Sequence, residues 1–121
     1  MTPIIIQVGN HTFLASLQDN PSSRALMEQC PMTVMMEEMN GNEKYYYLPV
    51  SMPTDTRSSG AIHTGDLMLY GSDCLVLFYK DFHTFYQYTR LGSVSDAARL
   101  SAELGDGSVQ VTFRLAKEPD C

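Results

Sequence analysis

The segment from Gly65 to Tyr79 constrains the fold of this chain more than any other segment. It reads GDLMLYGSDCLVLFY, two apolar strands separated by a turn at residues 71–73. Neither strand alternates apolar and polar residues, so both faces of the hairpin have to be covered. A chain of 121 residues can build one core, and a small closed barrel covers both faces most economically. We therefore expect a single domain over residues 1–121, with a core from about 4 to 115 and a frayed tail at 116–121.

The charge of the chain argues against a nucleic-acid partner. The formal net charge is −6, from 14 acidic and 8 basic residues, and the basic residues are scattered. Neutralising phosphates requires clustered cations, so we expect no nucleic acid to bind. No stretch approaches the ~20 apolar residues of a membrane span. The amino-terminal segment MTPIIIQ has no basic leader, so we expect a soluble, cytoplasmic protein, although a leader that had been removed would leave no trace.

Hydrophobic patterning predicts mostly strands, joined by recognisable turns. Asn40-Gly41 suits a type I′ hairpin turn, in which both central residues have positive φ. Asn20 is expected to cap a short helix that has Pro21 in its first position. The expected strands are residues 4–8, 11–17, 32–39, 43–48, 87–94 and 109–115, with two more in the segment 65–79.

Two stretches lack a clear pattern. Residues 49–63 are rich in Pro, Ser and Thr and read as one long loop, and residues 80–86 read as irregular. A second helix is expected to be capped by Ser95 and stopped by Gly105. Together, the expected elements make a mainly β chain. We expect it to form a closed eight-stranded β-barrel with two short α-helices capping its ends.

Three segments carry a resemblance to a known family: NEKYYYLP at 42–49, the hairpin at 65–79, and YTRLG at 88–92. They closely resemble the bacterial cyclophilin-like domain family of uncharacterised proteins. The resemblance implies the barrel of the cyclophilin prolyl isomerases, which carry an Arg followed by a Phe, a Met and a Gln on one strand. Residues 33–48 contain no Arg and no Gln, and Lys44 is their only base. Arg57 and Arg90 are the possible substitutes for the catalytic Arg.

The aromatic residues of the second half of the chain are the best functional lead. Alternation must place about half of these rings in the core, yet tyrosines at alternate positions also line grooves for extended peptides. We expect a groove that binds a small molecule or an extended peptide, with the loop at 49–63 as a possible rim and no cofactor. The residues expected to line it are Tyr46, Phe78, Phe82, His83, Tyr86 and Arg90.

The other reactive residues favour ordinary structural roles. His11, His63 and His83 form no metal-ligand spacing, so we expect no metal site. Cys30 and Cys74 read as buried free thiols, with a disulfide between them as the alternative.

Two other classes of function stay open. One is a divergent peptidyl-prolyl cis-trans isomerase in which Arg90 or Arg57 polarises the prolyl amide. The other is a self-associating domain that uses a methionine-rich strand as its contact surface. That strand contains Met32, Met35, Met36 and Met39. We expect a monomer or a weak dimer.

Overall fold

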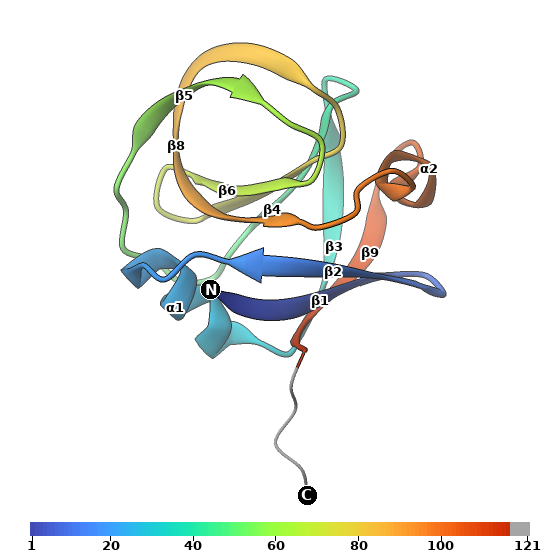
Figure 1. The fold of residues 1–121 in the computed structure, drawn as a ribbon, viewed down its shortest axis with the longest axis horizontal. Helices are drawn as coiled ribbons and strands as arrows, with labels where there is room; N and C mark the ends of the chain where they lie inside the picture. Colours follow the sequence, from blue (N-terminus) through green and yellow to red (C-terminus); the bar gives the residue numbers. More distant parts are fainter. Residues whose placement is uncertain (117–121) are drawn as a thin grey trace, which may run out of the picture.

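In the computed structural model, which describes residues 1–116, nine antiparallel strands form one sheet that closes on itself (Figure 1). The sheet order is β2-β1-β9-β3-β4-β7-β6-β8-β5, and an additional pairing of β2 with β8 closes eight of these strands into a barrel. The strands are β1 (Thr2–Val8), β2 (His11–Leu17), β3 (Met32–Met39), β4 (Glu43–Tyr47), β5 (Arg57–Ile62), β6 (Asp66–Tyr70), β7 (Cys74–Phe78), β8 (Phe82–Val94) and β9 (Val109–Leu115). The expected eight-stranded barrel is confirmed, and β5 is a ninth strand outside it. The tail that we expected to be frayed lies, from residue 117 on, outside the described residues.

Local signals fix the amino-terminal elements as expected. Asn40 and Gly41 have φ angles of 57° and 68°, as the type I′ turn requires. Helix α1 (Pro21–Gln29) begins after Asn20, whose side chain accepts a hydrogen bond from the backbone N–H of Ser23 at 2.8 Å. The Asn20 cap places the start of α1 directly after β2.

The second helix is shorter than the sequence suggests. Helix α2 (Leu100–Leu104) has Arg99 rather than Ser95 at its N-cap. The Asp96 carboxylate accepts a hydrogen bond from the N–H of Ala98, a local turn that competes with the helix. Gly105 ends α2 at a φ of 65°, as expected.

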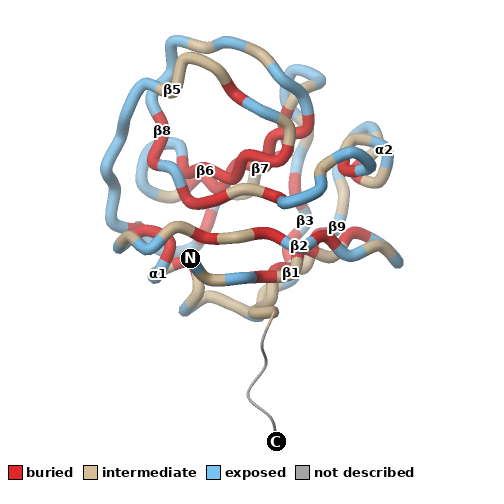
Figure 2. The backbone as a smooth tube through the Cα atoms, viewed as in Figure 1, coloured by how far each residue is buried: buried red, intermediate tan, exposed pale blue. Residues whose placement is uncertain are grey.

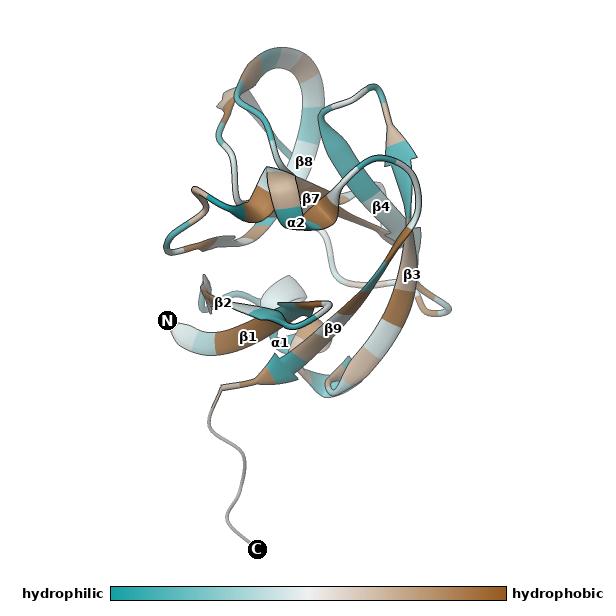
Figure 3. Ribbon diagram, turned by 90° about the vertical axis from the view of Figure 1, so that its right-hand side faces the viewer, coloured by the Kyte–Doolittle hydropathy of each residue, from teal (hydrophilic) through white to brown (hydrophobic). Residues whose placement is uncertain are grey.

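The main core fills the barrel. Residues at alternate positions of β1 and β2 point inward, and both helices add leucines, Leu26 from α1 and Leu100 and Leu104 from α2. The helices lie on opposite sides of the barrel (Figure 1), and the buried residues follow the strands that surround this core (Figure 2). In Figure 3, β1 is hydrophobic along most of its length, whereas β3 alternates between hydrophobic and more polar residues. No helix in the part of the chain that the structure describes is long and apolar enough to cross a bilayer.

A second, smaller core lies on the outer face of β6 and β7. β5 pairs with the first half of β8, and this two-stranded ribbon arches over the barrel (Figure 1). Ile62 and Phe82 from the ribbon pack with Met68, Val76 and Phe78 from the barrel. We call β5 and residues 82–88 of β8 the ribbon. It explains how both faces of the apolar hairpin are covered, one by the main core and one by the second core.

The ribbon corrects two sequence expectations. The stretch at 49–63 is not a single loop, because Arg57–Ile62 forms β5, and the stretch at 80–86 is not irregular, because β8 begins at Phe82. The β5 sequence RSSGAI has few β-branched or aromatic residues, so its strand state depends on the pairing with β8 rather than on local propensity. Gly60, at a φ of 67°, lies where the register between the two strands shifts.

A buried lysine joins the end of the β3–β4 hairpin to the turn after α2. Lys44 is fully buried, and its Nζ donates to Glu38 Oε1 at 2.8 Å, to the Gly105 carbonyl at 2.9 Å and to the Gly107 carbonyl. The Tyr79 hydroxyl donates to the same Glu38 oxygen at 2.7 Å. Burial alone would raise the pKa of Glu38, but the hydrogen bonds from Lys44, Tyr79 and the backbone of Gly41 lower it overall.

We expect Lys44→Met to lower the free energy of unfolding by about 2–4 kcal/mol, because Glu38 and two carbonyls lose their shared donor. Urea unfolding measures this loss. The matched control is Lys80→Met, which removes the same charge from an exposed position. Equal losses in the two variants would contradict a structural role for the buried ammonium group.

Candidate functional site

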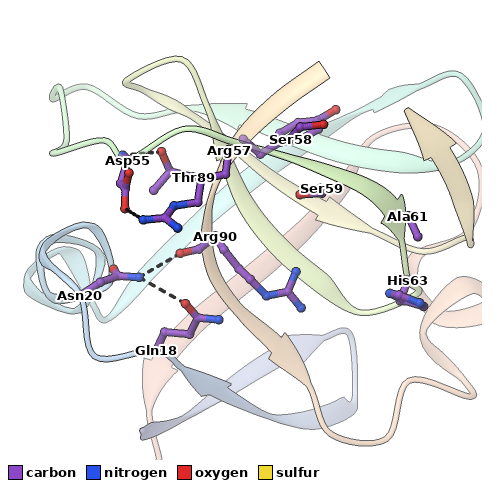
Figure 4. Close-up of a pocket in the computed structure, with 11 residues that line it drawn as sticks. Gln18, Asn20, Asp55, Arg57, Ser58, Ser59, Ala61, His63, Thr89 and Arg90 are labelled. Carbon is purple, nitrogen blue, oxygen red and sulfur yellow. Dashed lines mark hydrogen bonds and ion pairs between the residues drawn. The ribbon is translucent and has the colours of Figure 1, made fainter. Parts of the chain in front are cut away.

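A pocket lies between the ribbon and the connection from β2 to α1 (Figure 4). Its volume is about 610 Å³. Ligand pockets in proteins commonly have volumes of this order. It is lined by Gln18, Asn20, Asp55, Arg57, Ser58, Ser59, Ala61, His63, Tyr88, Thr89 and Arg90. Most of these side chains are polar, and two are arginines.

A β-bulge in β8 sets the position of Arg90. Leu67 of β6 pairs with Gly92 and Met68 pairs with Arg90, so Leu91 is an extra residue in β8. The start of α1 holds this bulge. Asn20 Nδ2 donates to the Arg90 carbonyl at 3.1 Å. The bulged strand therefore buries Leu91 in the main core and leaves the Arg90 side chain at the pocket.

A buried carboxylate anchors the guanidinium of Arg90. Arg90 Nη2 donates to Asp66 Oδ1 at 3.2 Å, and the side chain of Asp66 is 3% exposed. The other carboxylate oxygen of Asp66 accepts the backbone N–H of His63 at 2.9 Å. With only one donor engaged by Asp66, Arg90 keeps further N–H groups for a molecule in the pocket.

Arg57 reaches the same pocket from the ribbon. Its Nη2 donates to Asp55 Oδ2 at 3.0 Å, and both side chains of this pair are more than 70% exposed. The N–H of Asp55 donates to the Thr89 hydroxyl at 3.0 Å, which ties the segment before β5 to β8. Figure 4 shows that Arg57 and Arg90 come from different strands and that the guanidinium of Arg57 turns toward Asp55. The two arginines that the sequence offered as substitutes for the isomerase Arg thus line one pocket.

Comparison with known proteins agrees with this architecture. A model described as the cyclophilin-like family matches residues 6–114. The chain belongs to the cyclophilin-like family. The resemblance noted in the sequence is thereby confirmed, and no curated protein sequence matches the chain.

Two solved structures share the cyclophilin-like fold. One is the hypothetical protein AF2241 from Archaeoglobus fulgidus, with 15% identity, a TM-score of 0.71 and coverage of 95% of each chain. The other is McbB in complex with tryptophan, with 14% identity and a TM-score of 0.65, where the match covers 98% of this chain and 46% of McbB. At these identities the likeness shows the fold alone.

The six residues that we expected to line one groove lie in five places in the cyclophilin-like domain. Tyr46 packs against the main core, and Phe78 and Phe82 pack on each other in the second core, with ring centroids 5.6 Å apart. His83 is exposed on the ribbon, paired with Ala61. Tyr86 lines a separate, tyrosine-rich cleft, and Arg90 alone lines the large pocket. The expected groove residues therefore do not converge on one surface.

The sequence did not reveal that Gln18 lines the pocket, nor the roles of Asn20 and Asp66. Asn20 was assigned only as a helix cap, although its amide nitrogen also holds the β8 bulge. Asp66 lies in an apolar run, and a lone carboxylate at the start of a buried strand is a signal that a cation has to lie nearby. Nothing in the sequence indicates which cation that is.

The remaining reactive residues have structural surroundings. No group of three His, Cys, Asp or Glu side chains able to hold a metal ion occurs among residues 1–116. Cys74 is a buried free thiol, so it forms no disulfide with Cys30, and burial together with Asp73 and Glu43 raises its pKa to about 11. In the methionine-rich strand, Met36 is fully buried, while Met35 and Met39 are 49% and 40% exposed.

We expect Asp66→Asn to lower the free energy of unfolding by about 2–3 kcal/mol, because the buried partner of Arg90 loses its charge. The control is Asp55→Asn, which breaks the exposed pair with Arg57 and is expected to cost less than about 1 kcal/mol. Urea unfolding of both variants measures the difference. A loss for Asp66→Asn no larger than that of the control would show that Arg90 is not anchored in this way.

Proposed function

We propose that this cyclophilin-like domain binds a small molecule through a carboxylate group, which Arg90 and Arg57 hold in the pocket beneath the ribbon. The observation that carries the proposal is that two guanidinium groups line one pocket while Asp66 fixes one of them from behind. A guanidinium presents a planar set of donors that matches a carboxylate in geometry as well as in charge. Arg90 is ordered before a ligand arrives, so little side-chain entropy is lost on binding.

The rest of the lining suits a small polar molecule. Gln18 and Asn20 provide amide groups on one side, and Ser58 and Ser59 provide hydroxyls on the other. McbB, a structural neighbour, was solved in complex with tryptophan, an amino acid that carries a carboxylate group. That complex supports a carboxylate over a phosphate as the first ligand class to test.

We expect N-acetyl-L-tryptophan to bind measurably by isothermal titration calorimetry and N-acetyl-L-tryptophan amide to bind at least about tenfold more weakly. The two compounds differ at the carboxylate, so the ratio of their affinities isolates the contribution of that group. Arg90→Met is expected to lower the affinity for the acid by about tenfold and to leave the affinity for the amide unchanged.

The control variant is Arg24→Met, which removes a charge from α1 outside the pocket. It is expected to bind both compounds as the unchanged protein does. Equal affinity for the acid and the amide would contradict the proposal, as would an equal loss in the two arginine variants.

A divergent prolyl isomerase is the second candidate, because both possible substitutes for the catalytic Arg line the same pocket. The lining disfavours it. Ala61 and the mostly buried Tyr88 are its only apolar residues, whereas a prolyl ring needs an apolar pocket beside the polarising Arg.

We expect the protein not to accelerate cis-trans exchange in a panel of X-Pro peptides, measured by NMR exchange spectroscopy. Uncatalysed exchange takes about tens to hundreds of seconds, so catalysis would be evident. Faster exchange that is lost in Arg90→Met or in Arg57→Met would establish the isomerase instead.

A further inference from the structure

Tyrosines line a second cleft on the outer face of the barrel, on the sheet formed by β4, β7 and β6. Its volume is about 200 Å³. The lining residues are Met39, Asn40, Glu43, Tyr45, Tyr47, Tyr70, Cys74, Val76, Tyr86 and Tyr88. None of them is basic, and Glu43 is the one carboxylate among them. Apart from Tyr88, this tyrosine cleft shares no lining residue with the arginine pocket.

The tyrosine rings stand at steep angles to one another. Tyr45 and Tyr47 lie at alternate positions of β4, with ring centroids 5.7 Å apart and an angle of 77° between the rings. Tyr70 is 5.9 Å from Tyr86 and 5.6 Å from Tyr88. Rings from three strands thus present both faces and edges to the same small volume. The faces of aromatic rings attract cations.

Glu43 is a mostly buried residue whose side chain lines the cleft and has no partner among residues 1–116. The residue is 8% exposed, and its side chain makes no hydrogen bond or ion pair with any of the described residues. Lys44, the next residue, bonds instead to Glu38 and to carbonyls on the other face of the sheet. Burying an unpaired charge is costly. A cation in the cleft would supply the missing partner.

We propose that the tyrosine cleft binds a quaternary or methylated ammonium group, which the tyrosine rings surround and the carboxylate of Glu43 neutralises. This site is separate from the carboxylate pocket and does not depend on it. An ammonium that carries methyl groups fits better than a bare one, because the methyl groups contact the rings and leave no N–H group unsatisfied. The weak hydration of such a cation also suits a cleft whose lining includes the apolar side chains of Met39 and Val76.

Protonation of Glu43 gives the site a pH dependence. Burial, together with the charge of Glu38, raises the pKa of Glu43 to about 7. The titratable groups that interact electrostatically with it are Glu38 on β3, Cys74 on β7, Tyr79 after β7 and Tyr88 on β8. Glu38 has a lowered pKa, and burial raises the pKa of Cys74 to about 11 and those of Tyr79 and Tyr88 to about 12. Within this group, only Glu43 changes charge between pH 6 and pH 8.

The test compares choline with 3,3-dimethylbutan-1-ol, its neutral isostere, by isothermal titration calorimetry. We expect choline to bind at least about tenfold more tightly at pH 8. Its affinity is expected to rise about ninefold from pH 6 to pH 8, because the ionised fraction of Glu43 rises from about a tenth to about nine tenths. Glu43→Gln is expected to reduce the preference for choline and to abolish the pH dependence.

Matched variants separate the site from the fold. Glu28→Gln removes an exposed carboxylate on α1, and Phe85→Leu removes a fully exposed ring of the ribbon that does not line the cleft. Both are expected to bind choline unchanged, whereas Tyr86→Leu is expected to weaken it several-fold. Circular dichroism checks that each variant is folded. Equal binding of choline and its isostere, or no saturable choline binding at pH 8, would overturn the proposal.

Discussion

The structure depends on β8 pairing with different strands along its two halves. Its second half pairs with β2 and β6 and closes the barrel, and its first half leaves the barrel to pair with β5. The β5 pairing ends at Tyr88 and the β6 pairing begins at Thr89, and the bulge at Leu91 lies within the β6 pairing. Gly92 lies beside it at the closing pair with Leu17, where an added Cβ would lie 2.1 Å from the Ser16 carbonyl oxygen. Only a glycine lets the two strands approach so closely without a shift of the backbone.

The ribbon contributes residues to two hollows on the surface of the barrel. Ile62 and Phe82 anchor it to the outer face of β6 and β7 through the second core. One side of the ribbon then faces α1 and encloses the pocket of Arg57 and Arg90, and its other edge brings Tyr86 to the tyrosine cleft. The two hollows differ in charge, since arginines line the first and an unpaired glutamate lines the second. We infer that they take ligands of opposite charge.

Local sequence signals predicted the barrel well and the ribbon poorly. The Asn40-Gly41 turn and the Asn20 cap depend on residues within a few positions of each other, so the sequence carries them directly. The requirement that both faces of the hairpin at 65–79 be covered was also correct, but the outer cover is the ribbon rather than the closure of the barrel alone. β5 went unrecognised because its strand state comes from pairing with residues 20 or more positions away. The aromatic residues among the six expected site residues were chosen from a pattern that does not reveal on which face of its strand each ring lies.

The most direct test of this account is a pair of ¹⁵N–¹H correlation maps of one sample, recorded with N-acetyl-L-tryptophan and then with choline added. Two separate sets of shifted amides are expected. The acid is expected to shift Arg57, Thr89 and Arg90, and choline is expected to shift Glu43 and Tyr45. Shifts that fall on the same residues for both ligands, or an acid that leaves the amides of β5 and β8 unchanged, would contradict a ribbon that separates two sites.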